Sequence, residues 1–444
     1  MPALFGTDGV RGVAGVDLTA ELATSIARAA VAELGHGESR PLAVVGRDPR
    51  PSGGWLQDAV VSGLTTAGAD VALIGVIPTP AIARAVADGL PGMDDRPAFG
   101  VVISASHNPP ADNGIKLFGA GGVKLPEDVE SAIESRVGSD LASDVAGAVV
   151  ADFSTDNGWY VDALVKTLSS RLDGLRLVVD CANGAAATVA ERAYSSAGAT
   201  VTVINDDLSG ERINDGCGAT HPEAVQRAVL ETQADLGLAH DGDADRCIAV
   251  TATGEIVDGD GILAVLALAA KERGELRAGA IAATVMSNLG LTKALQRNGV
   301  GIATTAVGDR SVAERMRADA LSIGGEQSGH VILLDHATTG DGVLTGLHLA
   351  QAVARPGRSL ADLASVVQRL PQVLINVRVQ DRDRALAAAE EVTTEVAADL
   401  GNDGRVLVRA SGTEPLIRVM VEAETEDRAQ QLAERIATTL RSAL

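Results

Sequence analysis

Three aspartates alternate along the segment Asp241-Gly-Asp-Ala-Asp-Arg246, directly after the apolar run Leu236–Ala239. A curled loop can aim carboxylates at this spacing toward one hard cation, because such cations prefer oxygen ligands. Three neighbouring carboxylates also repel one another unless positive charge lies between them. An EF-hand needs Gly at the sixth position and Glu at the twelfth, where this segment has Arg246 and Ala252. We therefore expect a divalent-metal site of another kind, with a solvated acidic turn as the alternative.

A candidate nucleophile lies in the segment Ser104-Ala-Ser-His-Asn-Pro109, which follows the apolar run Phe99–Ile103. Doubly wound sheets bind ligands beyond the carboxyl ends of their strands. Two serines compete for the role, and Ser106 is followed directly by a histidine. Asn108 precedes a proline, which keeps its backbone out of helical geometry. The segment therefore predicts an irregular, exposed loop that carries a nucleophile, although serine and asparagine also form ordinary turns.

Two further segments combine polar groups with glycine. Arg409-Ala-Ser-Gly-Thr-Glu-Pro-Leu-Ile-Arg418 supplies two guanidinium groups, two hydroxyls and a loop whose backbone N–H groups can point at one anion. This composition indicates a phosphate clamp, with a strand-to-strand turn flanked by surface arginines as the alternative. Ile323-Gly-Gly-Glu-Gln-Ser-Gly-His330 offers a carboxylate, an amide, a hydroxyl and an imidazole, which suit the hydroxyls of a sugar. Taken alone, that segment is only a polar loop.

Several enzyme and binding classes are excluded by motif and by charge. The sequence lacks a Walker A segment, a GxGxxG followed by an acidic residue, HExxH and GxSxG, which argues against P-loop, Rossmann-cofactor, zincin and α/β-hydrolase chemistry. A net charge of −22 and an aromatic content of 2% disfavour nucleic acid and anionic membranes as partners. An enzyme that handles phosphate remains.

The cysteines and the N-terminal segment indicate a cytoplasmic location. Cys181, Cys217 and Cys247 are too far apart for a CxxC pair, and an odd number argues against a secreted disulfide framework. The segment MPALFGTDGVRG has no basic region followed by an apolar run. The apolar stretch Ile262–Ala270 is too short to span a bilayer. We expect no membrane partner.

The elements that must position these segments follow an α/β pattern. At 444 residues, with 46% hydrophobic and 22% charged residues, the chain is expected to form about three or more globular domains. Short apolar runs are each followed by Ala-rich segments with helical spacing, which is typical of βαβ units. The expected strands are 42–45, 71–75 and 99–103, then 175–180, 200–204 and 236–239, then 280–284, 301–305 and 321–323, with helices at 53–66, at about 186–197 and from near 289.

The C-terminal part differs from the rest. Residues 373–379, 405–410 and 416–423 alternate like strands of a half-exposed sheet, and residues 382–400 and 427–444 have amphipathic helical spacing. We expect a smaller α+β domain there. The polar segments 138–157 and 355–358 have the composition of junctions between domains.

Five segments taken together resemble the α-D-phosphohexomutases: Gly6-Thr-Asp-Gly-Val-Arg-Gly12, Ser104-Ala-Ser-His-Asn-Pro109, Asp241-Gly-Asp-Ala-Asp-Arg246, Gly325-Glu-Gln-Ser-Gly-His330 and Arg409-Ala-Ser-Gly-Thr-Glu-Pro415. The resemblance runs from Phe5 to Glu422. It implies an α/β fold of four domains around a central cleft: three related βαβ-type domains with mixed sheets and a smaller C-terminal α+β domain. The implied ranges are 1–152, 153–253, 254–368 and 369–444, which carry the phosphoserine, metal-binding, sugar-binding and phosphate-binding loops in turn.

The same resemblance implies a role for each matching residue. Ser106 would be the phosphoserine and Ser104 a bystander. Mg²⁺ would be held by Asp241, Asp243, Asp245 and a phosphate oxygen on Ser106. The groups at the reaction centre would be Arg11, Lys116, Arg246 and His330, with Lys116 or His330 as the base. The sugar hydroxyls would contact Glu326 and Ser328, and the phosphate that is not reacting would contact Arg409, Ser411, Gly412, Thr413 and Arg418.

The form Gly-Glu-Gln-Ser-Gly-His is similar to that of the branch of the family that acts on glucosamine phosphates. The resemblance then implies conversion of glucosamine 6-phosphate to glucosamine 1-phosphate through a 1,6-bisphosphate that turns around in the cleft, supplying peptidoglycan precursors. Ser106 would first be phosphorylated directly or by a sugar 1,6-bisphosphate, and the enzyme would be a monomer or a homodimer. The alternatives are a mutase for mannose or glucose phosphates, a metal-dependent sugar phosphatase and a non-catalytic sugar-phosphate sensor.

Overall fold

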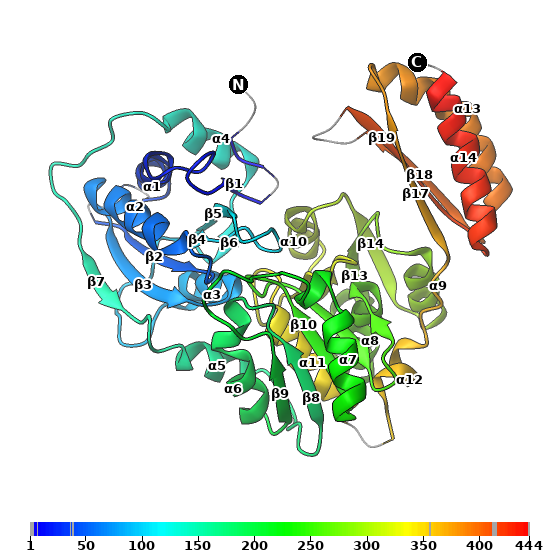
Figure 1. Cartoon of the computed structure of the whole chain (residues 1–444), viewed down its shortest axis with the longest axis horizontal. Helices are drawn as coiled ribbons and strands as arrows, with labels where there is room; N and C mark the ends of the chain where they lie inside the picture. Colours follow the sequence, from blue (N-terminus) through cyan, green and yellow to red (C-terminus); the bar gives the residue numbers. More distant parts are fainter. Residues whose placement is uncertain are drawn as a thin grey trace. The chain divides into compact units, whose positions relative to one another are not determined.

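The computed structural model of the chain describes residues 4–6, 8–35, 37, 40–354, 357–410 and 415–442. The chain divides into two compact units, Met1–Val285 with Val300–Ala364, and Met286–Gly299 with Ser365–Leu444. Figure 1 labels their elements along the colour gradient of the sequence. None of the described helices combines the length and the apolar character that a membrane span needs.

The first sheet of the larger unit has the strand order β1-β5-β4-β2-β3-β7, and β6 pairs with β5. Its elements are β1 Val10–Val13, α1 Ala20–Leu34, β2 Leu42–Arg47, α2 Gly53–Thr66, β3 Asp70–Val76, α3 Thr79–Asp88, β4 Phe99–Ile103, β5 Asp112–Gly119, β6 Val123–Lys124, α4 Glu127–Arg136 and β7 Val149–Asp152. The strands β2, β3, β4 and β7 are parallel, whereas β5 is antiparallel to both β1 and β4. The expected parallel strands and crossover helix are present. The segment predicted as a junction contributes the short edge strand β7, which pairs with β3 on one side only and is mostly exposed.

The second sheet has the order β12-β11-β10-β8-β9. Its elements are α5 Gly158–Val165, β8 Arg176–Asp180, η1 Ala185–Thr188, α6 Ala190–Ser196, β9 Thr200–Ile204, η2 Gly218–Thr220, α7 Glu223–Thr232, β10 Leu236–His240, β11 Cys247–Thr251 and β12 Ile256–Val257. The strand β11 returns antiparallel beside β10, so residues 241–246 form the turn between them. The single helix predicted at about 186–197 is wrong, because Val189 at φ −135° separates the 3₁₀ turn η1 from α6.

The third sheet has the order β14-β13-β15-β16. Its elements are α8 Gly259–Arg273, η3 Arg277–Gly279, β13 Ala280–Thr284, β14 Gly301–Thr305, α10 Asp309–Ala318, β15 Ile323–Gly325, β16 Val331–Leu333, α11 Gly342–Val353 and α12 Leu360–Ala364. The strands β15 and β16 form an antiparallel hairpin whose loop is residues 326–330. The strand expected at 321–323 begins two residues later, because the N–H of Leu321 closes the end of α10 on the carbonyl of Met316 at 2.8 Å.

The smaller unit is the α+β domain that the C-terminal pattern predicts, joined by one earlier helix. It contains α9 Leu289–Arg297, β17 Gln372–Arg378, α13 Arg382–Leu400, β18 Arg405–Ala410, β19 Leu416–Glu422 and α14 Glu426–Ser442. The strands form an antiparallel sheet in the order β17-β19-β18. Aliphatic side chains such as Val419, Val421 and Ile436 make its core.

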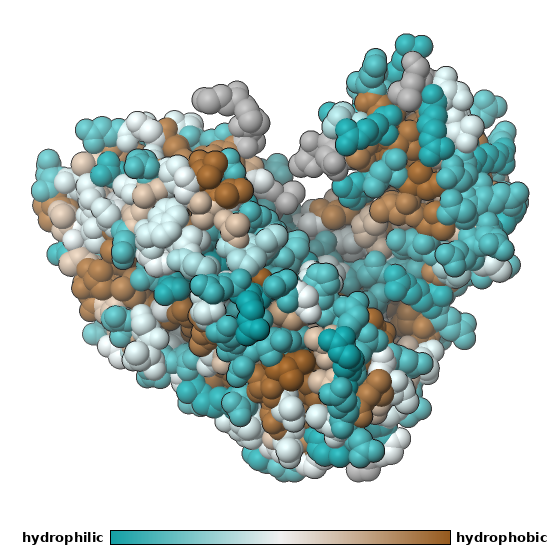
Figure 2. Space-filling view, in the orientation of Figure 1, coloured by the Kyte–Doolittle hydropathy of each residue, from teal (hydrophilic) through white to brown (hydrophobic). Residues whose placement is uncertain are grey.

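Aliphatic residues also build the core of the larger unit, as the low aromatic content requires. In its first domain, Val45 of β2 and Phe99 of β4 join a cluster with Ile26 of α1 and Leu56 of α2, and all are almost fully buried. On the face shown in Figure 2, hydrophobic residues occur in small groups among hydrophilic ones. The parallel strands are therefore held from one side by α1 and α2, and their carboxyl ends are left to carry the loops of the site.

Candidate active site

The loop after β4 places one of its two serines against residues 241–246, the predicted metal-binding turn, called the metal loop below. Ser104 donates its hydroxyl to Asp48 Oδ2 at 2.6 Å, and it accepts the N–H of Ser106 at 2.9 Å. Ser106 lies in the left-handed region at φ +52°, and its Oγ donates to Asp241 Oδ2 at 2.7 Å. Ser106 is fully buried, so the expectation of an exposed loop is wrong at this residue: residues of the second domain cover it. Ser104 holds the loop, and Ser106 faces the aspartates.

The turn between β10 and β11 gathers the three predicted aspartates. One carboxylate oxygen from each of Asp241, Asp243 and Asp245 lies within 4.8 Å of the others, and all three residues are buried. Ala244 at φ +57° gives the turn its curl. Burial, and then the charges of Asp245 and Asp243, raise the pKa of Asp241 to about 7. Concentrated negative charge of this kind calls for a cation.

The chemistry of the carboxylate oxygens that accept no hydrogen bond fits a divalent cation at this turn. Asp243 Oδ1 and Asp245 Oδ1 are buried and have no hydrogen-bond partner. The other oxygen of Asp243 accepts from Thr79 Oγ1 at 2.7 Å and from Lys116 Nζ at 2.8 Å. Buried carboxylate oxygens without partners are costly, and hard cations such as Mg²⁺ take oxygen ligands. Among the described residues, no other group of three acidic, histidine or cysteine side chains has this geometry.

Lys116 on β5 joins the metal loop to the N-terminal segment. Its buried Nζ lies 2.8 Å from Asp243 Oδ2 and 2.8 Å from Asp8 Oδ2. Burial lowers the pKa of Lys116, but the charges of Asp243 and Asp8 raise it by more, so the net pKa lies above its ordinary value. In this arrangement Lys116 is a cation rather than a base.

His330, at the end of the loop between β15 and β16, is buried beside Asp245. Its Nδ1 lies 3.4 Å from Asp245 Oδ2, and its Nε2 accepts the N–H of Gly340 at 3.1 Å. That hydrogen bond requires a lone pair on Nε2, which puts the proton on Nδ1. Burial lowers the pKa of His330, and the charge of Asp245 raises it by more. A cation on Asp245 would weaken that rise and favour the neutral imidazole.

Two arginines from different domains flank these groups. Arg246 Nε lies 3.8 Å from Asp241 Oδ2 and 3.7 Å from Asp245 Oδ1. Arg11 on β1 forms an ion pair with Asp8 and donates from Nε to the Asp8 carbonyl at 3.3 Å. Both side chains are about one-quarter exposed, at 22% and 24%. They can therefore meet an anion that enters from solvent.

His107, next to the candidate nucleophile, carries no charge near neutral pH. Its Nδ1 lies 3.4 Å from Ser106 Oγ. Burial, and then the charges of Arg246 and Arg11, lower the pKa of His107 to about 4. A neutral imidazole therefore lies beside the hydroxyl of the candidate nucleophile.

Sequence reasoning missed a charge network that links the first domain to the third. The Asp8 carboxylate pairs with Lys116 Nζ at 2.8 Å and with Lys124 Nζ at 2.5 Å. Lys124 also pairs with Asp309 at the start of α10, and Asp309 Oδ2 lies 3.6 Å from His330 Nε2. Asp8 belongs to a segment that the sequence analysis singled out, so a signal existed for it. Lys124 and Asp309 lie in no such segment.

The predicted sugar loop has mixed exposure. Glu326 is partly buried, and its Oε1 accepts the N–H of Gly308 at 3.1 Å. Ser328 is exposed. Gln327 donates to Asp258 Oδ2 at 3.3 Å, and Asp258 caps the N-terminus of α8. The loop is thus anchored to α8 through Gln327, and the side chain of Ser328 is open to solvent.

The predicted phosphate clamp lies in the smaller unit. Arg409 on β18 stands directly opposite Arg418 on β19, and both are partly buried. Burial, and then the charge of Arg418, lower the pKa of Arg409. Like charges directly opposite on a sheet are destabilising, so the pair favours an anion between them. The other residues predicted for the clamp lie outside the described residues: Ser411, Gly412 and Thr413.

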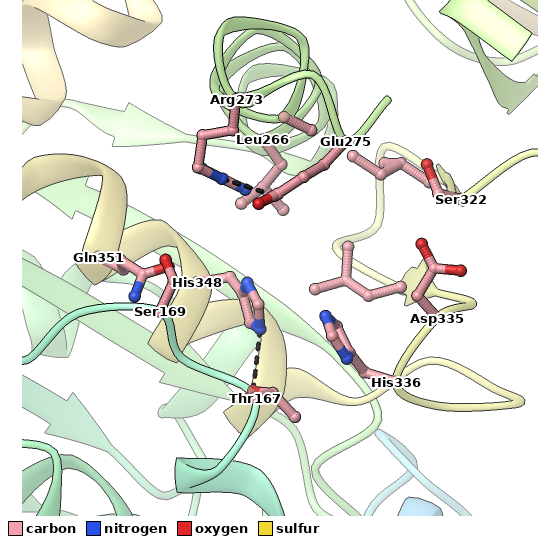
Figure 3. Close-up of a pocket in the computed structure, with 13 residues that line it drawn as sticks. Thr167, Ser169, Leu266, Arg273, Glu275, Ser322, Asp335, His336, His348 and Gln351 are labelled. Carbon is pink, nitrogen blue, oxygen red and sulfur yellow. Dashed lines mark hydrogen bonds and ion pairs between the residues drawn. The ribbon is translucent and has the colours of Figure 1, made fainter. Parts of the chain in front are cut away.

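A separate cavity of about 220 Å³ lies where α8, α11 and the β15–β16 hairpin meet residues 167 and 169 (Figure 3). The rings of His336 and His348 stack there with centroids 5.0 Å apart, and Thr167 Oγ1 lies 3.0 Å from His348 Nε2. Arg273 pairs with Glu275 at 2.6 Å. Among the described residues that line this cavity, none belongs to the predicted site.

A buried serine that faces three aspartates, with lysine and arginine cations around them, suits an enzyme that transfers phosphoryl groups. Family models described as phosphoglucomutase/phosphomannomutase match α/β/α domain I at residues 2–143, domain II at 159–254, domain III at 258–370 and the C-terminal domain at 374–439. The chain belongs to this family, the α-D-phosphohexomutases, and has its α/β fold of three related domains and a smaller C-terminal one. The domain boundaries given above from the sequence stay predictions.

Curated relatives match the chain along its whole length. A phosphoglucosamine mutase of Frankia alni is 54% identical over 464 residues, covering 100% of this chain and 99% of the relative. A phosphoglucosamine mutase of Salinispora tropica is 55% identical over 454 residues with the same coverage. Among solved structures, a phosphoglucomutase/phosphomannomutase family protein from Burkholderia thailandensis aligns with a TM-score of 0.84 and 27% identity, covering 99% of this chain and 97% of that one.

Proposed function

We propose that this chain isomerises glucosamine 6-phosphate to glucosamine 1-phosphate by way of a phosphoserine at Ser106. The observation that carries the proposal is the buried hydrogen bond of 2.7 Å from Ser106 Oγ to Asp241 Oδ2 within the carboxylate cluster. The chain's relatives at 54% and 55% identity, matched from end to end, support glucosamine phosphates as the substrates.

The reaction consists of two phosphoryl transfers in opposite directions. In the first, the bond between phosphorus and Ser106 Oγ breaks, a bond forms between phosphorus and the C1 oxygen of the sugar, and the C1 hydroxyl proton ends on Ser106 Oγ. The product is the 1,6-bisphosphate. After the bisphosphate turns around, the bond between phosphorus and the C6 oxygen breaks and a bond forms between that phosphorus and Ser106 Oγ, while the serine proton ends on the C6 oxygen. This second transfer frees glucosamine 1-phosphate and restores the phosphoenzyme. No water, oxidant or external donor enters the balance.

Charge neutralisation and positioning do most of the work in phosphoryl transfer. Lys116 and Arg246 would stabilise the charge on the phosphoryl group as it moves, and Arg11 would contact it from β1. Of the two predicted bases, Lys116 would first have to lose the proton that it holds beside Asp243 and Asp8, and His330 would first have to release the Gly340 N–H from Nε2. Bound to Asp241, Asp243 and Asp245, Mg²⁺ would neutralise the phosphate on Ser106.

The remaining predicted residues would recognise the substrate. Glu326 and Ser328 would bind sugar hydroxyls from the loop between β15 and β16. A clamp for the phosphate that is not reacting would consist of Arg409, Ser411, Gly412, Thr413 and Arg418. Because the bisphosphate turns around, the one clamp would serve the C6 phosphate of the substrate and the C1 phosphate of the product.

The test is an assay that separates isomerisation from phosphate release. Intact-mass measurement of the purified protein should show one phosphoryl group, lost in Ser106→Ala. Turnover should then be compared on the 6-phosphates of glucosamine, glucose, mannose and N-acetylglucosamine, with the 1-phosphate product and inorganic phosphate measured separately. We expect glucosamine to be fastest, with little phosphate released. Preference for glucose or mannose, release of phosphate in place of isomerisation, or binding without turnover would each replace the proposal with the corresponding alternative.

We further infer that the enzyme works as a monomer or homodimer in the cytoplasm. Direct phosphorylation of Ser106 or a sugar 1,6-bisphosphate would activate it. Light scattering and incubation of the dephosphorylated protein with glucose 1,6-bisphosphate test the two statements.

A further inference from the structure

The backbone of the serine loop is held by two buried side chains from two different domains. The carbonyl of Ser106 accepts from Arg50 Nη2 at 2.9 Å and from Asn214 Nδ2 at 2.9 Å. The carbonyl of Asn108 accepts from the same two atoms, at 2.8 Å and 3.1 Å. The loop residue beside the nucleophile, His107, lies between these two anchored carbonyls. Neither donor, Arg50 or Asn214, belongs to the motifs that identified the site.

Arg50 fixes the loop from the first domain. It is 1% exposed, and its Nε donates to Asp48 Oδ2 at 2.9 Å. Its Nη1 donates to the carbonyl of Asp112 at 3.0 Å and to that of Pro109. With the two Nη2 hydrogen bonds, each of the five donors of the guanidinium has an acceptor. A buried arginine so fully satisfied makes a rigid support.

Asn214 fixes the same carbonyls from the second domain, which carries the metal loop. It is 8% exposed, its own N–H donates to the Ala182 carbonyl at 2.9 Å, and its backbone lies in the left-handed region at φ +61°. Asparagine tolerates that region better than most residues. Its side chain therefore extends from a fixed backbone across the boundary between the domains.

The metal loop packs closely against the contact between Asn214 and the Ser106 carbonyl. A Cβ atom built on Gly242 would lie 2.6 Å from the carbonyl oxygen of Ser106 and 2.7 Å from Asn214 Nδ2. Real Cβ atoms do not approach other heavy atoms so closely, so position 242 needs glycine. The Ser106 carbonyl is thus wedged between the Asn214 amide and the backbone that joins Asp241 to Asp243. The contact sets how far the nucleophile lies from the carboxylates.

We propose that Asn214 is a positioning residue for phosphoryl transfer, which holds Ser106 at its working distance from the metal-binding aspartates by hydrogen bonds to the Ser106 and Asn108 carbonyls. The inference rests on the proposed function of Ser106 as phosphoserine. A misplacement of about 1 Å can lower the rate of an enzymatic step about 100-fold, so two hydrogen bonds across a domain boundary can control the transfer without contacting the substrate.

Asn183 provides a matched control in the same domain. It is 4% exposed and lies at φ +50°. Its Nδ2 donates to the Arg212 carbonyl at 3.1 Å, and its Oδ1 accepts the N–H of Asp207 at 3.1 Å. These bonds support the chain segment that leads to Asn214 but do not reach the serine loop. Removing the Asn183 side chain therefore gives a comparable loss of hydrogen bonds without the positioning contact.

The experiment compares Asn214→Gly and Asn183→Gly with the unchanged chain. Glycine adopts the positive φ at both positions and removes the side chain, and its greater backbone freedom affects both variants alike. Single-turnover transfer from phospho-Ser106 to glucosamine 6-phosphate, steady-state kcat and KM, and the thermal midpoint are measured for each. For Asn214→Gly we expect the single-turnover rate to fall about tenfold or more, with KM changed by less than about twofold. Asn183→Gly should lower the thermal midpoint by a similar amount and leave the rate within about twofold.

Three results would overturn the inference. Equal single-turnover rates in the two glycine variants would show that Asn214 contributes only to folding. A loss of rate in proportion to the fall of the thermal midpoint in both variants would show the same. Asn214→Asp keeps size and backbone preference while turning a carboxylate toward two carbonyl oxygens. It should be at least as slow as Asn214→Gly, and a normal rate would also contradict the proposal.

Failure of the proposed function gives a different result. If the unchanged chain carries phosphate on Ser106 but transfers it to no sugar, the mutase function is wrong. The inference is then decided by the rate at which phospho-Ser106 loses phosphate to water in the three proteins. A rate changed at least fivefold in Asn214→Gly but not in Asn183→Gly supports positioning, and equal rates reject it.

Discussion

Ser106 Oγ and Asp241 Oδ2 lie 2.7 Å apart in a buried hydrogen bond, although 135 positions separate the two residues in the sequence. The first belongs to the loop after β4 and the second to the turn after β10. Two domains must therefore pack correctly before the proposed nucleophile meets a carboxylate of the proposed metal site. The chemistry of the chain depends on a contact between domains more than on either loop alone.

Ser106→Ala should abolish phosphorylation and isomerisation, whereas Ser104→Ala should retain a substantial fraction of activity. Ser104 contributes hydrogen bonds to Asp48 and to the Ser106 N–H, so its loss should lower the free energy of unfolding by about 1–3 kcal/mol. Intact-mass measurement, the coupled assay and denaturant unfolding check these outcomes. Equal losses of activity in the two variants would reject Ser106 as the sole phosphate carrier.

Asp243→Asn should raise the Mg²⁺ concentration needed for half-maximal activity and lower turnover while the chain stays folded. The substitution keeps volume and removes one charge from the cluster, and it weakens the contact with Lys116 Nζ, now 2.8 Å. A Mg²⁺ titration of activity with circular dichroism of the variant is the measurement. An unaltered Mg²⁺ dependence would count against the cluster as the metal site.

In the absence of divalent cations, the free energy of unfolding of the chain should fall as the pH rises from about 4 toward 7. Burial and the two neighbouring carboxylates raise the pKa of Asp241 to about 7, so the folded state binds a proton that the unfolded state has already lost. Stability falls with pH wherever the folded state holds more protons. The thermal midpoint in a chelator should therefore fall over this interval more for the unchanged chain than for Asp241→Asn, and saturating Mg²⁺ should reduce the difference. Parallel curves for the two proteins in chelator would show that Asp241 does not titrate there.

Arg418→Ala should weaken substrate binding and let the bisphosphate escape. A charge-assisted hydrogen bond is worth about 1.5–3 kcal/mol, which corresponds to roughly tenfold or more in binding. Phosphorylation of Ser106 should remain. Because the intermediate must be retained while it turns, the variant should release more 1,6-bisphosphate per product formed, measured by phosphorus NMR. A raised KM with an unchanged leakage ratio would mean that the clamp does not retain the intermediate.

The sequence by itself determined the parts of this protein whose information is local. Asp241, Asp243 and Asp245 alternate after one fully buried strand, and the loop of Ser106 follows another. Both segments can be recognised in the sequence because a few neighbouring residues determine the turn and the side chains that it carries. The parallel strands and the smaller α+β domain followed from periodicity, which also reflects only near neighbours. The antiparallel strands β5 and β11 were not predicted. Each pairs with the strand before it, β4 or β10, only because the loop between the two strands reverses the chain.

Only the tertiary structure decided which groups hold the site together. Arg50 and Asn214 donate hydrogen bonds to backbone carbonyls. Because every residue has a carbonyl, no pattern of side chains in the sequence predicts these contacts. Asn214 also lies 108 positions from Ser106 in the sequence. Likewise, Lys124 and Asp309 become partners only because two domains pack side by side. Spacing along the chain specifies a loop, but the distance between two loops is set by the folding of the domains that carry them.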